Sequence, residues 1–159
     1  MKESLGDDAD DDALETLAFL ADPRTFNSAR VRQACIPSAN GHFNAIALAQ
    51  FYSSMIEGNE HLPSLLSRDT VKKATKLYAT DKSGEVHTKF GIGWQLYDFE
   101  SGSRGVGHTG FGGSIALFLP DSGYSIAITT NQLHVKRNPS VRQILDMITT
   151  AIGAGKLHK

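Results

Sequence analysis

The sequence predicts an α+β fold in which an antiparallel sheet is flanked by helices. Three strand-like stretches lie between residues 90 and 131, at 90–99, 113–119 and 124–131. Consecutive strands joined by short connections pair in the antiparallel sense. Amphipathic helical patterns lie on both sides of these stretches in the chain, over 45–57 and 139–152. We therefore expect a sheet of about three strands that packs against helices on at least one face.

The N-terminal region divides into a tail and the start of the domain. Residues 1–12 are strongly acidic, and because like charges repel each other we expect a disordered, solvated tail. Residues 13–21 carry an apolar stripe at helical spacing, and Pro23 suits the first turn of a second helix. We place a single domain over residues 13–153 and expect residues 154–159 to fray.

Capping residues mark the beginnings of three helices. Asn44 precedes the first amphipathic stretch, and Asn138 precedes the last one. Ser67 precedes a shorter helical stretch over residues 70–77. Asn and Ser side chains accept hydrogen bonds from the free N–H groups of a first helical turn. The polar residues 78–88 that follow predict a loop.

Two glycine-rich turns border the second predicted strand. Residues 120–123 (Pro-Asp-Ser-Gly) predict a tight hairpin turn, because Pro restricts φ, Asp bonds its own backbone and Gly accepts a positive φ. Residues 107–114 (Gly-His-Thr-Gly-Phe-Gly-Gly-Ser) allow two interpretations. They form either a second hairpin corner or a site at which glycine lets the backbone approach a ligand.

Four motifs follow one another along the chain. They are Phe-Gly-Ile-Gly-Trp at 90–94, Gly-His-Thr-Gly-Phe-Gly-Gly at 107–113, Leu-Pro-Asp-Ser-Gly-Tyr at 119–124 and Ala-Ile-Thr-Thr-Asn at 127–131. The ordered set resembles the C-terminal part of the β-lactamase-related serine hydrolases, which include class C β-lactamases, D-Ala-D-Ala peptidases and related esterases. The resemblance covers roughly residues 31–133. It implies a partial β-lactamase/transpeptidase-like fold, and in this family His-Thr-Gly is a common variant of a Lys-Thr-Gly triplet.

The resemblance implies a substrate-binding role for this turn. It places His108-Thr109-Gly110 on the strand that lines the cleft, with Gly113 in register. Thr109 would offer its hydroxyl to a substrate carboxylate or carbonyl. His108 would supply a ring N–H whose contribution depends on pH, because imidazole titrates near neutrality. Gly110 would admit the substrate backbone, and the backbone N–H of Phe111 would be one oxyanion donor. The alternative for His108 taken alone is a structural histidine bonded to a neighbouring strand.

The chain departs from the family pattern at the nucleophile. No Ser has a Lys three positions later and no Tyr has an Asn two positions later, so neither the Ser-x-x-Lys nor the Tyr-x-Asn motif is present. The nearest imitation is Thr70-Val71-Lys72-Lys73, which falls where the family has a surface helix. Losing a nucleophile or its base costs on the order of 10⁶ in rate. We therefore assign no catalytic residue and expect no hydrolysis by this chain alone.

The expected function is that of the C-terminal portion of a serine hydrolase whose intact relatives form an acyl-enzyme on small acyl, peptide or ester substrates. A missing N-terminal half or a partner chain would complete it. Two other roles stay open. The chain is alternatively a non-catalytic module that binds a ligand at the cleft strand, or an interaction module that pairs through an open sheet edge.

Composition excludes several further classes. The net charge is −1 and no basic patch is present, so we expect no nucleic-acid partner. The five histidines other than His108 lack metal-ligand spacing, and we expect neither a metal nor another cofactor; they are His42, His61, His87, His134 and His158. No apolar run reaches the roughly 18 residues that a membrane span needs. Cys35, the one cysteine, is expected to pack in the interior. With no signal-peptide pattern, a soluble intracellular protein is favoured, and an organelle is the alternative.

Overall fold

The structure is a computed structural model that describes residues 22–37, 39–56, 63–82, 87–132 and 138–158. The chain divides into two units, Met1–His42 and Phe43–Lys159. The predicted domain over residues 13–153 includes parts of both. The predicted acidic tail and the predicted helix over 13–21 lie outside the described residues.

The described part of the first unit contains two short helical segments. The 3₁₀-helix η2 (Pro23–Asn27) begins after Asp22, whose side chain accepts a hydrogen bond from the first turn. Ser28 ends η2 and caps α2 (Ala29–Gln33) by accepting a hydrogen bond from a backbone N–H of that helix. The helix expected from Pro23 is thus present as two capped pieces, because Ser28 holds an extended conformation between them.

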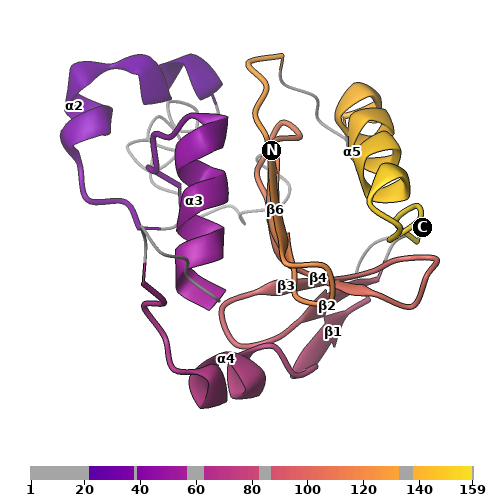
Figure 1. Ribbon diagram of the computed structural model, residues 1–159. Coiled ribbons are helices and arrows are strands. Elements are labelled where there is room, and N and C mark those ends of the chain that lie inside the picture. The colour runs from indigo at the N-terminus through magenta and orange to yellow at the C-terminus, as the bar shows by residue number, and fades with distance from the viewer. Residues whose placement is uncertain (1–21, 38, 57–62, 83–86, 133–137, 159) are drawn as a thin grey trace. The chain divides into compact units, whose positions relative to one another are not determined.

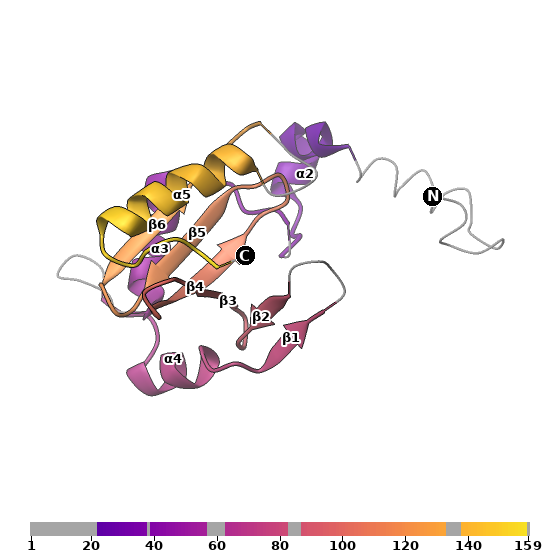
Figure 2. The ribbon, with the colours of Figure 1, turned by 90° about the vertical axis from the view of Figure 1, so that its right-hand side faces the viewer.

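The second unit is built on a six-stranded sheet in which every strand pairs antiparallel with the next one along the chain. Figure 2 shows the strands side by side in this order. They are β1 (Ala79–Asp81), β2 (Thr88–Phe90), β3 (Gln95–Asp98), β4 (Arg104–Thr109), β5 (Ile115–Leu119) and β6 (Tyr124–Ile128). The predicted α+β class is confirmed, whereas the predicted number of strands is too low.

The missed strands have weak local signals. β1 lies within residues 78–88, which the sequence predicts as a loop because they are polar. The single strand predicted over 90–99 is two strands, because the N–H of Gly91 bonds the carbonyl of Trp94 and turns the chain between them. β4 contains two glycines and lacks clear alternation. Pairing with neighbours determines all these strands, and it overrides intrinsic preference.

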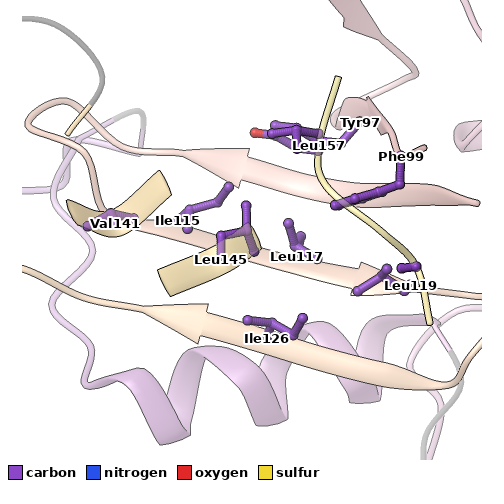
Figure 3. Packing of buried hydrophobic residues seen from close by; sticks show 10 residues of the cluster. Tyr97, Phe99, Ile115, Leu117, Leu119, Ile126, Val141, Leu145 and Leu157 are labelled. Atoms are coloured by element: carbon purple, nitrogen blue, oxygen red, sulfur yellow. The ribbon is translucent and has the colours of Figure 1, made fainter. Parts of the chain in front are cut away.

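Helices cover both faces of the sheet. Figure 1 shows α3 (Ala45–Ile56) on one face and α5 (Pro139–Ala151) on the other. Every residue of β5 is buried, because its alternate side chains enter the two cores. Ile115, Leu117 and Leu119 pack with the α5 residues Val141 and Leu145, as Figure 3 shows. Ala116 and Phe118 pack on the other face with Tyr52 of α3 and Leu96 of β3.

The predicted helix caps are confirmed. Asn44 accepts a hydrogen bond from a backbone N–H of α3 at 2.8 Å. Ser67 caps α4 (Arg68–Ala74), which begins two residues before the predicted start. Asn138 accepts hydrogen bonds from two backbone N–H groups of α5 and is itself buried. Each cap satisfies donors that a helix cannot satisfy internally.

The C-terminal segment differs from the expectation that residues 154–159 fray. Ala154 and Leu157 are buried in the core beside α5, and Leu157 forms an antiparallel bridge with Phe99. The side chain of Asp146 also accepts a hydrogen bond from the backbone N–H of Leu157 at 3.1 Å. This segment is therefore ordered as far as His158, because its backbone pairs with the sheet and its apolar side chains enter the core.

Candidate functional site

The triplet predicted to bind substrate lies at the end of a central strand. His108 and Thr109 are the last two residues of β4, and Gly110 begins the turn to β5. Gly107, which precedes them, has a packing role. A Cβ at this position would lie 2.1 Å from the carbonyl oxygen of Ala116 on β5, so β4 and β5 approach too closely for any side chain here.

His108 and Thr109 present their side chains on opposite faces of the sheet. His108 pairs with Ala116, whose side chain enters the core beside α3. Thr109 pairs with Ile115, whose side chain enters the core beside α5. Directly paired residues lie on the same face of a sheet, and successive residues alternate. A ligand that touches both side chains must therefore lie across the end of β4, beside Gly110.

The imidazole of His108 is exposed. Its Nδ1 atom lies 3.2 Å from the carbonyl oxygen of Thr109, the next residue in the chain. Within the ranges that the structure describes, the ring has no partner on a neighbouring strand. The arrangement expected of a structural histidine is thus not the one observed, and the ring is accessible to a ligand.

The turn after Thr109 is closed by two backbone hydrogen bonds. The N–H of Gly110 donates to the carbonyl of Ser114 at 2.8 Å, and the N–H of Gly113 donates to the carbonyl of Gly110 at 3.1 Å. Between them, Phe111 is 79% exposed. Its backbone N–H has no hydrogen-bond partner among the described residues, so it is a donor that a ligand could use.

The glycines of this turn serve different purposes. Gly112 and Gly113 have φ values of 92° and 109°, a region that favours glycine. A Cβ on Gly113 would also lie 2.4 Å from the Cβ of Asn138, so packing against the cap of α5 accounts for this glycine. At Gly110 the nearest atom to such a Cβ is 3.8 Å away. Of Gly110 and Gly113, the open position is therefore Gly110.

Gln95 is part of the site and is absent from the sequence-based set. Its Oε1 atom accepts hydrogen bonds from the backbone N–H of Thr109 at 3.0 Å and from the Thr109 hydroxyl at 2.9 Å. The hydroxyl of Tyr97 donates to the same oxygen. Alternation along β3 places Gln95 and Tyr97 on one face, but only the pairing of β3 with β4 brings them to Thr109.

The imitation of the nucleophile motif has a structural explanation. Thr70 lies in the first turn of α4, where its backbone N–H and its hydroxyl both contact the capping hydroxyl of Ser67, at 3.1 and 2.8 Å. Both Thr70 and Lys73 are exposed, on a helix without buried residues. The motif is thus accounted for by helix capping.

Other features lie outside the triplet. Trp94 packs on Tyr52 with ring centroids 5.6 Å apart and belongs to the core beside α3. Cys35 is exposed, so the expectation that it packs is wrong. A groove of about 710 Å³ follows α5 and Lys156 and includes none of the triplet residues. Over the described ranges, no three His, Cys, Asp or Glu side chains are grouped to hold a metal ion, and no helix could cross a membrane.

Comparisons with known proteins agree with the sequence motifs. A family model described as Beta-lactamase matches residues 3–147. The esterase/beta-lactamase LipL of Mycobacterium tuberculosis is 33% identical over 102 residues, which cover 62% of this chain and 24% of LipL. The chain therefore spans about a quarter of the length of that curated relative. No solved structure matches this chain significantly.

Proposed function

Because this chain belongs to the β-lactamase family, we propose that it supplies the substrate-docking strand of a serine hydrolase. The observation that carries the proposal is the end of β4. An exposed imidazole at His108, open space at Gly110 and a backbone N–H at Phe111 that has no partner among the described residues follow one another there. The imidazole and the N–H are hydrogen-bonding groups of the kind that hold an acyl substrate beside a nucleophile, and the open space at Gly110 leaves room for that substrate.

Each of the three groups has a distinct role in this proposal. The ring of His108 donates a hydrogen bond to the substrate on the face of the sheet that carries α3. Gly110 lets the substrate backbone lie against the end of β4. The N–H of Phe111 donates to the oxygen that becomes negatively charged when the carbonyl is attacked. One such donor is worth about 10²–10³ in rate.

We propose further that the chain does not hydrolyse its substrate alone. The sequence has no Ser-x-x-Lys motif, and Thr70 is committed to the cap of α4. The nucleophile and its base would come from polypeptide other than this sequence. This chain would then supply the smaller, electrostatic contribution to the rate of hydrolysis, and the other polypeptide would supply the larger contribution of the nucleophile.

The substrate in this proposal is an ester or a β-lactam. The name of the mycobacterial relative includes both activities. Both substrates present a carbonyl that passes through a tetrahedral oxyanion, for which the same backbone N–H can serve.

The test combines a binding measurement with covalent labelling. Titration of the ¹⁵N-labelled chain with benzylpenicillin should shift the amide signals of His108, Gly110 and Phe111. His108→Ala should weaken binding about tenfold, the value of one hydrogen bond to a charged group. Asp121→Ala, in the turn after β5, is the matched control and should leave the affinity unchanged.

Two results would contradict this proposal. Shifts confined to residues away from the end of β4 would reject the docking role. Covalent labelling of the purified chain by a fluorescent penicillin or a fluorophosphonate would show that a nucleophile is present and would reject the proposed inactivity.

A second candidate function, association with another chain, rests on the edge of the sheet at β6 and on the exposed side of α5. β6 is an edge strand among the described strands, and Ile144 and Met147 of α5 are 45% and 67% exposed. Edge strands and exposed apolar side chains favour association with another chain. Native mass spectrometry tests this role. A complex that Met147→Lys weakens would support it, whereas a wild type that is monomeric and remains so in Met147→Lys would exclude it.

A further inference from the structure

We propose that Gln95 makes Thr109 a hydrogen-bond acceptor toward the substrate, so that this position selects a ligand N–H rather than a carboxylate. The inference rests on the proposed docking role of β4 and specifies its substrate class. It also reverses the role that the family resemblance implies for Thr109, which is donation to a carboxylate or carbonyl. Gln95 acts through Thr109 and is therefore a positioning residue.

The orientation of the Gln95 carboxamide follows from its neighbours. A backbone N–H can only donate, so the atom that faces the N–H of Thr109 at 3.0 Å must be the oxygen Oε1. The Thr109 hydroxyl lies 2.9 Å from the same oxygen. Because a carbonyl oxygen only accepts, a hydrogen bond between these two atoms is donated by the hydroxyl. Tyr97 donates to this oxygen as well, which disfavours a flipped amide further.

The hydroxyl of Thr109 has one proton and two lone pairs. Its proton is directed at Gln95, so only the lone pairs remain for a ligand. A carboxylate at this point would place its lone pairs against those of the hydroxyl, whereas an amide N–H would find an acceptor. We infer that substrates carry an N–H donor on the Thr109 side of the strand end.

The position of Gln95 makes this arrangement firm. Gln95 lies on β3 and pairs with Gly107, two residues before Thr109. The β3–β4 pairing ends at that residue, so the side chain of Gln95 continues the pairing to the end of β4. The hydroxyl of Tyr97, a residue of the buried core, holds the carboxamide from the other side.

The experiment compares two probes that differ in one group. N-acetylalanine carries a carboxylate, and N-acetylalaninamide carries an amide in its place. Their dissociation constants are measured by NMR titration of the full chain at pH 8. The wild type should bind the amide more tightly. Gln95→Met removes the acceptor at similar volume and frees the hydroxyl proton, so relative affinity for the carboxylate should rise about tenfold.

Three further variants separate this mechanism from a structural effect. Thr109→Val in the Gln95→Met background should abolish the gain for the carboxylate, because no hydroxyl remains. Gln95→Glu keeps an acceptor and adds a charge, so it should retain the Thr109 amide proton shift and weaken the carboxylate probe. It also serves as the test if Gln95→Met does not fold. Gln50→Met, at an exposed glutamine of α3, is the matched control and should change neither probe.

The outcomes distinguish the two proposals. An unchanged preference in Gln95→Met, or a gain that survives Thr109→Val, overturns the inference and leaves the docking role intact. Should neither probe nor benzylpenicillin bind the wild type, the docking role is overturned and this inference with it. A carboxylate preference in the wild type that depends on Thr109 would likewise reject the inference.

Discussion

Two glycine-containing turns border the same strand, β5, and differ in how they use their backbone donors. In the turn over residues 120–123, the N–H groups of Ser122 and Gly123 both bond the carbonyl of Leu119. In the turn over residues 110–113, the N–H of Phe111 has no partner among the described residues. In the turn over residues 120–123 the N–H of Asp121 likewise has no partner among the described residues. Neither glycine content nor one unpaired N–H therefore separates a plain corner from a candidate site, and the surroundings of each turn must be compared.

The two turns also differ in their anchoring. The turn before β5 is fixed from outside, because Gly113 lies against Asn138 and the hydroxyl of Ser114 accepts a hydrogen bond from the N–H of Thr130 at 3.0 Å. The turn after β5 is held by its own backbone bonds. In the proposed function, anchoring from outside would hold the N–H of Phe111, which has no partner among the described residues, in a fixed position for a ligand, and such preorganisation is what electrostatic catalysis requires.

The largest expected effect is at the last glycine of each turn. Gly113→Ala combines a φ of 109° with a clash against Asn138 and should lower the free energy of unfolding by about 3 kcal/mol or more. Gly123→Ala, at a φ of 70°, should cost about 1 kcal/mol. Urea denaturation measures both. Equal losses would remove the difference in anchoring between the two turns.

The next effect concerns the residue that holds the first turn. Asn138→Ala removes the buried cap of α5 and should cost about 1–2 kcal/mol. Ser67→Ala removes an exposed cap of α4 and should cost about 0.5–1 kcal/mol. Thermal unfolding of both variants checks this order. A larger loss at Ser67 would mean that burial at Asn138 adds nothing.

Phe111 should separate binding from stability. Its side chain is largely exposed, so Phe111→Ala should change the free energy of unfolding by less than about 0.5 kcal/mol. Because the ring stands beside the proposed donor, the same variant should weaken benzylpenicillin binding by about three- to tenfold. Tyr124→Ala, next to the other turn, is the control for binding. If both variants weaken benzylpenicillin binding equally, the turn over residues 110–113 does not have the proposed binding role.

The smallest effect involves an ion pair between β2 and β3. Lys89 Nζ lies 2.5 Å from Asp98 Oδ2, and this hydrogen bond lowers the pKa of the Asp98 carboxyl. A lowered pKa contributes stability above the unfolded value of about 3.9, and that stability is lost as pH falls through the folded pKa.

Asp98→Asn should therefore cost less than about 1 kcal/mol at pH 7, since both groups are partly exposed. It should also reduce the loss of stability between about pH 4 and pH 2. Urea midpoints across this range measure the effect. A wild-type profile identical to that of the variant would show that the pair contributes no net stability.

The parts that the sequence predicts correctly have local causes. The caps at Asn44, Ser67 and Asn138 each bond a backbone N–H two or three residues away. The turn over residues 120–123 also closes within its own four residues and their neighbour. Local hydrogen bonds of this kind leave a signature in residue type and spacing.

The parts that the sequence does not predict depend on distant partners. Gly91, which follows β2, leaves no room for a side chain, because a Cβ there would lie 2.2 Å from the carbonyl oxygen of Ala74 in α4. Gln95 reaches Thr109, fourteen positions later, only through the register of β3 with β4. The resemblance directs attention to Thr109, but the direction of its hydrogen bond requires the neighbouring strand.

The position of the His108 side chain is fixed by the three residues that precede it in β4 rather than by the imidazole itself. Val106 is buried in the core beside α3. On the opposite face, a Cβ on Gly105 would clash with Phe99, and a Cβ on Gly107 would clash with Leu117 of β5. Sliding β4 by a single residue would bring these side chains to the wrong faces. The packing of Gly105, Val106 and Gly107 thus fixes the register that leaves the imidazole of His108 exposed, without any of the three contacting a ligand. Because His108 is exposed, replacing it by another basic residue should cost little stability, whereas a side chain at Gly105 or Gly107 would clash with its neighbours.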